Sequence, residues 1–76
     1  MIIYGTRQCP DTVACLEALD AKGCPYEFRN IENLSVLKEF LQFRDNDASF
    51  DPVKAAGGVG IPVIVRDDGS LSFDWE

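Results

Sequence analysis

The chain has 76 residues, a net charge of −6 and no histidine. The charge argues against nucleic-acid binding, which needs a basic face, and the lack of histidine excludes a His-based triad or metal site. This length predicts one domain, 1–76, that buries only about 60% of its unfolded surface. No apolar run approaches the ~20 residues of a membrane span, and no signal peptide precedes the first apolar run. We therefore expect a cytoplasmic protein without membrane contact.

The first half of the chain predicts a strand, a helix and a second strand. Residues 2–4 form an apolar run that ends at Gly5, which is typical of a buried strand. Pro10 suits the first position of a helix, where its missing N–H costs nothing. The following residues have helical spacing, and one face of the predicted helix carries Thr12, Cys15, Leu16 and Leu19. Gly23 ends this helix, and the alternation over 26–31 indicates a strand.

The second half predicts two helical segments and a hairpin. Asn33 or Ser35 can cap a helix that runs to about residue 44, with an apolar stripe of Val36, Leu37, Phe40, Leu41 and Phe43. Residues 46–49 break this pattern, and Asp51-Pro52 then resembles the cap and first residue of a short helical turn over 53–56. An apolar strand follows at 63–65, and Asp68-Gly69 predicts a two-residue hairpin to a last strand at 71–73.

The resulting order is β-α-β-α-β-β, an α/β fold. A βαβ unit makes the first two strands parallel, and the hairpin adds antiparallel strands, so we expect a four-stranded mixed sheet. The predicted core consists of Ile3, Leu16, Leu19, Phe28, Leu37, Leu41, Val63 and Val65.

Cys9 is the strongest candidate for chemistry. It lies at the start of the predicted helix, where unpaired backbone N–H groups and the helix dipole favour a thiolate over a thiol. Arg7 is close enough in sequence to add positive potential. Downstream, Ile61-Pro62 runs straight into a strand, and we expect a cis peptide bond there that lies in contact with Cys9.

The other two cysteines are not expected to pair with Cys9. Cys15 lies six residues further along the same helix, about 9 Å at 1.5 Å per residue, and disulfides need Cα atoms within about 7 Å. Its place on the apolar stripe predicts a core residue. Cys24 lies about 20 Å from Cys9 by the same rise. It is expected to be an exposed thiol without an assigned role.

Tyr4-Gly5-Thr6, Cys9-Pro10-Asp11-Thr12 and Gly60-Ile61-Pro62 together resemble small bacterial glutaredoxin-related proteins of the thioredoxin-fold superfamily. The resemblance spans nearly the whole chain and implies a thioredoxin-like, glutaredoxin-type fold without its usual last helix. It also implies thiol–disulfide exchange through Cys9.

In the family a second cysteine normally stands where this chain has Thr12, whose hydroxyl can bond the Cys9 sulfur or cap the helix but cannot be oxidised. The implied mechanism is therefore monothiol. Turnover then needs an external thiol such as glutathione or another low-molecular-weight thiol, and no metal or resident cofactor is expected. The resemblance gives Ile61 and Pro62 a role in docking a substrate chain, and Arg7 and Pro10 complete the expected substrate-binding residues. Protein or small-molecule disulfides are the expected partners.

Two other functions remain open. The domain could hold an iron–sulfur cluster between two subunits through Cys9 and external thiols, or it could bind partners with little turnover. The missing last helix also predicts an uncovered apolar face. Phe73 or Trp75, expected on one face of the last strand, could fold back over it, or two chains could bury it together, which leaves a monomer or a weak homodimer.

Overall fold

The computed structural model describes residues 1–75, and Glu76 lies outside the described part. Its elements, in chain order, are β1 Ile2–Gly5, α1 Pro10–Ala21, β2 Glu27–Asn30, α2 Leu34–Asn46, the 3₁₀ turn η1 Ala48–Phe50, α3 Asp51–Ala55, β3 Val63–Val65 and β4 Leu71–Ser72. The four strands form one sheet in the order β2-β1-β3-β4. β1 and β2 are parallel, and the other two pairs are antiparallel. The expected α/β class with a four-stranded mixed sheet is therefore confirmed.

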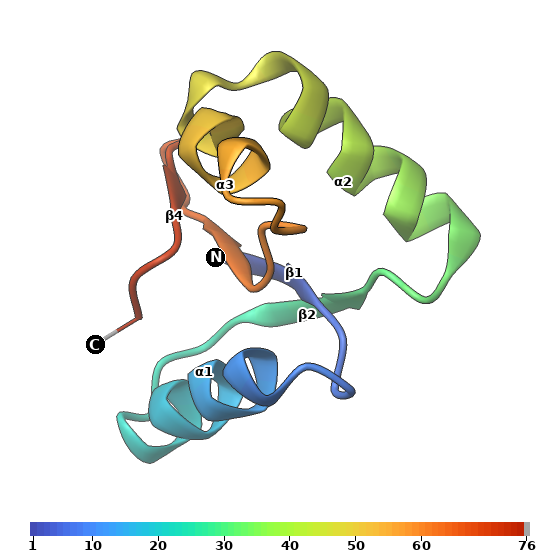
Figure 1. Ribbon diagram of the computed structural model, residues 1–76. Helices are drawn as coiled ribbons and strands as arrows, with labels where there is room; N and C mark the ends of the chain where they lie inside the picture. Colours follow the sequence, from blue (N-terminus) through green and yellow to red (C-terminus); the bar gives the residue numbers. More distant parts are fainter. Residues whose placement is uncertain (76) are drawn as a thin grey trace.

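The sheet separates two layers of helix. α1 covers one face, and α2 and α3 lie on the other (Figure 1). Side chains alternate between the faces of a strand, so paired residues of β1 and β3 define each layer. Ile3 pairs with Ile64 and packs toward α1. Tyr4 pairs with Val63 and packs toward α2.

Each face has its own apolar cluster. The α1-side core consists of Ile3, Cys15, Leu16, Leu19 and Ile64. The α2-side core consists of Tyr4, Phe40, Phe50 and Val63. The face predicted for α1 is confirmed, because Thr12, Cys15, Leu16 and Leu19 are its buried residues.

Of the predicted core, Ile3, Leu16, Leu19 and Val63 are buried, while Phe28, Leu37 and Val65 are partly buried against the two cores. Leu41 was wrong, since its side chain is 39% exposed. Successive residues of a helix differ by about 100° in direction. Phe40, the residue before Leu41, faces the sheet and is the fully buried residue of α2. The predicted apolar stripe does pack on the sheet, but its most buried residue is Phe40 and not Leu41.

Phe50, which directly follows the predicted break at 46–49, is fully buried although no pattern predicted it as a core residue. The Asp47 side chain accepts a hydrogen bond from the Ser49 backbone N–H at 2.9 Å, which starts the 3₁₀ turn η1. That turn directs Phe50 inward, where its ring meets the Phe40 ring edge-on at a centroid distance of 5.8 Å. α3 consequently begins at Asp51, with Phe50 rather than Asp51 as its N-cap.

Element ends differ from the sequence prediction by a few residues. Asn33, not Ser35, caps α2 by accepting hydrogen bonds from the backbone of Ser35 and Val36. The hairpin after β3 has three loop residues rather than two, because Gly69 N–H bonds Arg66 C=O while Arg66 N–H bonds Ser70 C=O. Gly69 has a φ of +87°, as the last residue of such a loop requires.

The expectation that Phe73 and Trp75 share a face was wrong. The Phe73 ring packs edge-on against Phe50 at 5.1 Å on the α2 side, whereas Trp75 packs against the α1-side core. β4 ends at Ser72, whose hydroxyl bonds both the N–H and the C=O of Asp74. This local turn ends the strand alternation before Trp75. Trp75 therefore covers part of the face that was expected to be bare, and Lys22 at the end of α1 donates to its C=O at 3.1 Å.

Within residues 1–75, no helix has both the length and the apolar character needed to cross a membrane.

Candidate functional site

Cys9 lies where the sequence predicted, at the start of a helix. It is the N-cap of α1 in extended backbone conformation, with φ −92° and ψ 120°, and Pro10 follows as the first helical residue. Its N–H closes a turn onto the C=O of Thr6 at 3.0 Å. Its side chain is partly exposed and makes no capping hydrogen bond. The sulfur is thus accessible at the start of a helix.

Glu32 holds the turn that carries Cys9, a contact that no sequence pattern indicated. Its carboxylate accepts hydrogen bonds from the Thr6 hydroxyl at 2.9 Å and from the Gln8 side-chain amide at 2.7 Å. The loop after β2 is thereby joined to the loop after β1. Hydrogen bonding with the side chains of Thr6, Asn30 and Gln8, largest effect first, lowers the pKa of Glu32.

We expect Glu32→Gln to change how the free energy of unfolding depends on pH below neutrality. A carboxyl whose pKa is lower in the folded state stabilises the fold above its unfolded pKa, and that contribution is lost as pH falls through the folded pKa. The difference in unfolding free energy between wild type and Glu32→Gln should therefore be largest near neutral pH and shrink on acidification. Urea unfolding of both proteins, followed by circular dichroism from neutral to acidic pH, measures this difference.

Glu17→Gln is the matched control, since Glu17 is an exposed residue of α1. Equal pH profiles for the two variants would contradict a stabilising role of the Glu32 contacts.

Thr12 lies three residues after Cys9, and its side chain is fully buried. Its Oγ1 has no hydrogen-bond partner among the described residues, so the expected bond to the Cys9 sulfur, or to the helix start, is not formed. Thr12 packs instead against the backbone of Gly5, where an added Cβ would lie 2.7 Å from Oγ1. Thr12 therefore joins the first turn of α1 to the end of β1.

Arg7 makes a different contact from the one its sequence position suggested. Its guanidinium carbon lies 5.2 Å from the centre of the Phe28 ring in β2, within range of a cation–π interaction. No ion pair or hydrogen bond joins it to Cys9 within the described residues. Arg7 thus packs over β2 rather than facing the thiol.

A groove of about 400 Å³ lies beside the first turn of α1. It is lined by Asp11, Val53, Gly58, Val59, Gly60, Ile61, Pro62, Phe73 and Trp75. The Ile61–Pro62 peptide bond is cis, as predicted. The fold thus brings Ile61 and Pro62 to the same helix turn that Cys9 caps. The predicted direct contact of Pro62 with Cys9 stays a prediction, because Asp11 is the α1 residue in the groove wall.

Arg44 positions one wall of this groove, and the sequence analysis missed it. From α2, its Nε donates to the C=O of Val59 and its Nη2 to the C=O of Gly58, both at 2.9 Å. Charge-assisted bonds of this kind are stronger than neutral ones. A guanidinium that holds two consecutive carbonyls fixes the course of the chain just before Gly60.

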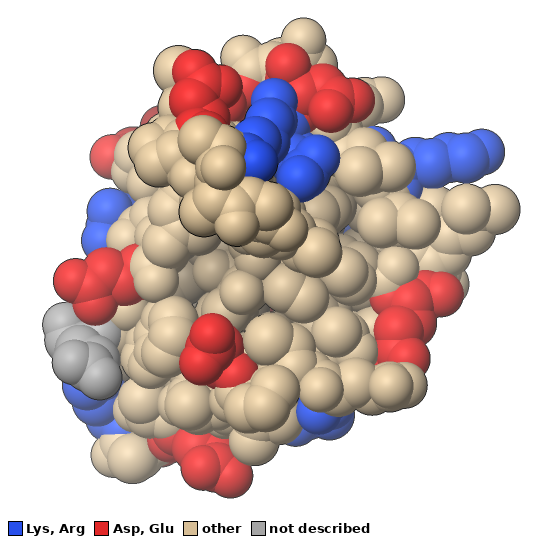
Figure 2. Space-filling model, in the orientation of Figure 1, with Lys and Arg blue, Asp and Glu red and all other residues tan. Residues whose placement is uncertain are grey.

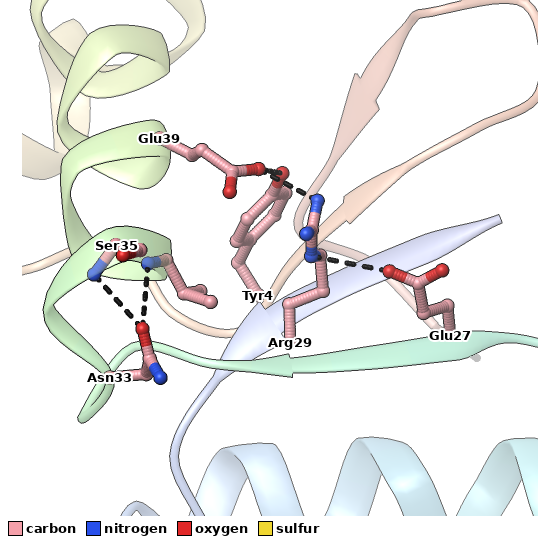
Figure 3. Close-up of polar contacts among 7 residues, drawn as sticks. Tyr4, Glu27, Arg29, Asn33, Ser35 and Glu39 are labelled. Atoms are coloured by element: carbon pink, nitrogen blue, oxygen red, sulfur yellow. Dashed lines mark hydrogen bonds and ion pairs between the residues drawn. The ribbon is translucent and has the colours of Figure 1, made fainter.

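A second polar network lies on the opposite face of the sheet from α1. Tyr4 and Arg29 both donate to one carboxylate oxygen of Glu39, at 3.0 and 2.7 Å, and Arg29 also pairs with Glu27 (Figure 3). These residues join β1 and β2 to α2. Burial is the main cause of the raised pKa of Tyr4. The network holds α2 against the sheet. None of its residues lines the groove, so its role is structural.

The remaining cysteines lie apart from the groove. Cys15 is fully buried, as predicted for a core residue, and burial raises the pKa of its thiol. Cys24 was expected to be exposed but is partly buried against the α1-side core. It borders a larger cavity of about 710 Å³ near the start of β1. Among residues 1–75 no group of three or more acidic, histidine or cysteine side chains is arranged to hold a metal ion.

Comparison with known proteins identifies a relative. No family model matches the chain, and no solved structure matches it. An uncharacterized protein of Haemophilus influenzae is 36% identical over 74 residues, which cover 96% of this chain and 86% of that protein. At this identity over nearly the full length of both sequences, the chain belongs to the same protein family as the Haemophilus influenzae protein.

Proposed function

We propose that this chain is a thioredoxin-like domain of the glutaredoxin type that exchanges disulfides through Cys9. The observation that carries the proposal is the position of Cys9. It is a partly exposed thiol at the N-cap of α1, and the same helix turn borders a groove that contains Ile61 and Pro62. The sheet order β2-β1-β3-β4, with a parallel first pair, also agrees with such a fold.

The proposed step is attack of the Cys9 thiolate on one sulfur of a disulfide. A bond forms between Cys9 Sγ and that sulfur, the original S–S bond breaks, and the second sulfur leaves as a thiolate that takes a proton from water. Cys9 is oxidised to a mixed disulfide, and half of the substrate is reduced to a thiol.

Release from the mixed disulfide requires a second thiol, and the chain does not place one at Cys9. Thr12 cannot be oxidised, Cys15 is fully buried, and Cys24 lies beyond the other end of α1. An external low-molecular-weight or protein thiol would attack the mixed disulfide, leave with the bound half of the substrate as a new disulfide, and regenerate Cys9.

Cys9→Ser tests this proposal. We expect the wild type to form one mixed disulfide with bis(2-hydroxyethyl) disulfide near neutral pH, seen as a mass increase that maps to the peptide containing Cys9. The Cys9→Ser variant should show no mixed disulfide at this peptide, because a serine hydroxyl cannot form a disulfide bond.

Cys24→Ser is the matched control, because it also removes one partly buried thiol. It should keep the wild-type rate. Modification of Cys24 in preference to Cys9 would overturn the enzymatic proposal and favour a domain that binds partners without turnover.

A further inference from the structure

The groove that borders the first turn of α1 has an apolar wall with a single acidic residue in it. Of the nine described residues that line it, Asp11 is the only ionisable one, and the others are apolar or glycine. In the orientation of Figure 1, the surface between α3 and α1 is mostly uncharged and is interrupted by acidic rather than basic atoms (Figure 2). An anionic ligand would thus meet a carboxylate and no cation in the groove wall.

None of the basic residues Arg7, Arg44 and Lys54 lines the groove. Arg44 donates to the backbone carbonyls of Gly58 and Val59, and Arg7 lies over the Phe28 ring. Lys54 follows the groove residue Val53 in α3 but is exposed and does not line the groove. The net charge of −6 adds long-range repulsion of anions.

The uncharged part of the groove is suited to apolar side chains. Phe73 and Trp75 contribute aromatic surface, and Val59 and Ile61 border them. Val59 is 53% exposed, so its side chain offers apolar surface to a ligand. Aromatic and aliphatic groups around a concave site provide most of the binding area for an apolar ligand.

We propose that this groove docks an apolar protein segment that carries the disulfide, and that Asp11 selects against anionic disulfides such as glutathione disulfide. The inference rests on the proposed function of Cys9 and names the substrate class of that site. Asp11 is a specificity-determining residue, because it lies in the first turn of α1, two residues after the reacting thiol.

Three symmetrical small disulfides test the charge selection at low ionic strength, where screening is weak. They are glutathione disulfide, which is anionic, bis(2-hydroxyethyl) disulfide, which is neutral, and cystamine, which is cationic. The rate of mixed-disulfide formation at Cys9 is measured for each disulfide. It is then divided by the rate at which N-acetylcysteine methyl ester, a free thiol, reacts with the same disulfide. This ratio removes the differences in intrinsic reactivity among the three disulfides. The normalised order should be cystamine, then the neutral disulfide, then glutathione disulfide.

Asp11→Lys should change the ratio of the glutathione disulfide rate to the cystamine rate by tenfold or more in favour of glutathione disulfide. Tenfold corresponds to about 1.4 kcal/mol. The substitution also changes the charge at the helix start and so the reactivity of Cys9 itself, but that effect is common to all three disulfides and cancels in the ratio. Glu17→Lys makes the same charge change on an exposed part of α1 and should alter the ratio less than threefold.

Peptide disulfides test the apolar part of the proposal. Two peptides that differ only in whether leucine or glutamate flanks the cysteine are offered as disulfides with the same small thiol. Cys9 should attack the leucine peptide at least tenfold faster after normalisation, and Asp11→Asn should narrow this difference.

The outcomes separate the two proposals. Three results would overturn the selectivity and leave the function of Cys9 intact. They are a higher normalised rate with glutathione disulfide than with cystamine, an equal ratio of the two rates in Asp11→Lys and Glu17→Lys, and equal normalised rates for the leucine and glutamate peptides. Absence of reaction at Cys9 with every probe would overturn both.

Discussion

Gly60→Ala should lower the free energy of unfolding by about 3 kcal/mol, the sum of about 1–2 kcal/mol for a left-handed alanine and about 1–3 kcal/mol for overpacking. Gly60 has a φ of +96°, and an added Cβ would lie 2.7 Å from Cε1 and 2.8 Å from Cδ1 of Phe50. The Phe50 ring is fully buried and packs edge-on against both Phe40 and Phe73, so it cannot move aside without disturbing two other rings. Urea unfolding at neutral pH measures the loss.

Gly57→Ala is the matched control for backbone conformation. Gly57 also has a positive φ, +78°, but an added Cβ would meet nothing within 4 Å. Gly57→Ala should lower the free energy of unfolding only by the conformational contribution, about 1–2 kcal/mol. The difference between the variants isolates the clash with Phe50. Equal losses would show that Phe50 does not restrict this position.

The Gly60 substitution should also affect the groove. Gly60 lies between the carbonyls that Arg44 holds and the Ile61–Pro62 wall. Relief of the clash would shift that wall, so we expect slower mixed-disulfide formation at Cys9 with apolar peptides under conditions where the variant is still folded.

Thr12→Cys should convert the protein into a dithiol form with an internal disulfide to Cys9. Cys9 is the N-cap, and Thr12 lies three residues later in the first turn, close to the ~5.5 Å Cα separation that disulfides prefer. The substitution breaks no hydrogen bond within the described residues, because the Thr12 hydroxyl has no partner there. Mass spectrometry after mild oxidation should show the loss of two hydrogens, and reduction of a protein disulfide should become faster than in wild type.

Ala14→Cys is the control, since it adds a cysteine to an exposed position of the same helix, five residues after Cys9. It should remain reduced within the molecule, because the helix carries its Cα beyond the reach of Cys9. If Thr12→Cys also stayed reduced, the first turn would not have the geometry described above.

Local patterns along the sequence were sufficient to predict several features. The spacing of Thr12, Cys15, Leu16 and Leu19 predicted the buried face of α1, because a helix repeats every 3.6 residues whatever it packs against. Cys9 before Pro10 predicted the helix start, and Ile61-Pro62 predicted the cis bond. Asp68-Gly69 predicted the hairpin, although its loop proved to be three residues long. Each of these signals depends only on neighbours within one turn.

Contacts between distant residues determined the rest. Asp47 initiates a turn that buries Phe50, yet only the packing of Phe40 and Phe73 around that ring makes the turn part of the core. Glu32 holds the turn that carries Cys9, and Arg44 holds one wall of the groove, through bonds that span 26 and 15 residues along the chain. No periodicity encodes such pairs. For the same reason, the sequence alone identified Cys9 as the candidate thiol, whereas the tertiary structure placed Asp11 and two aromatic side chains in one groove beside it.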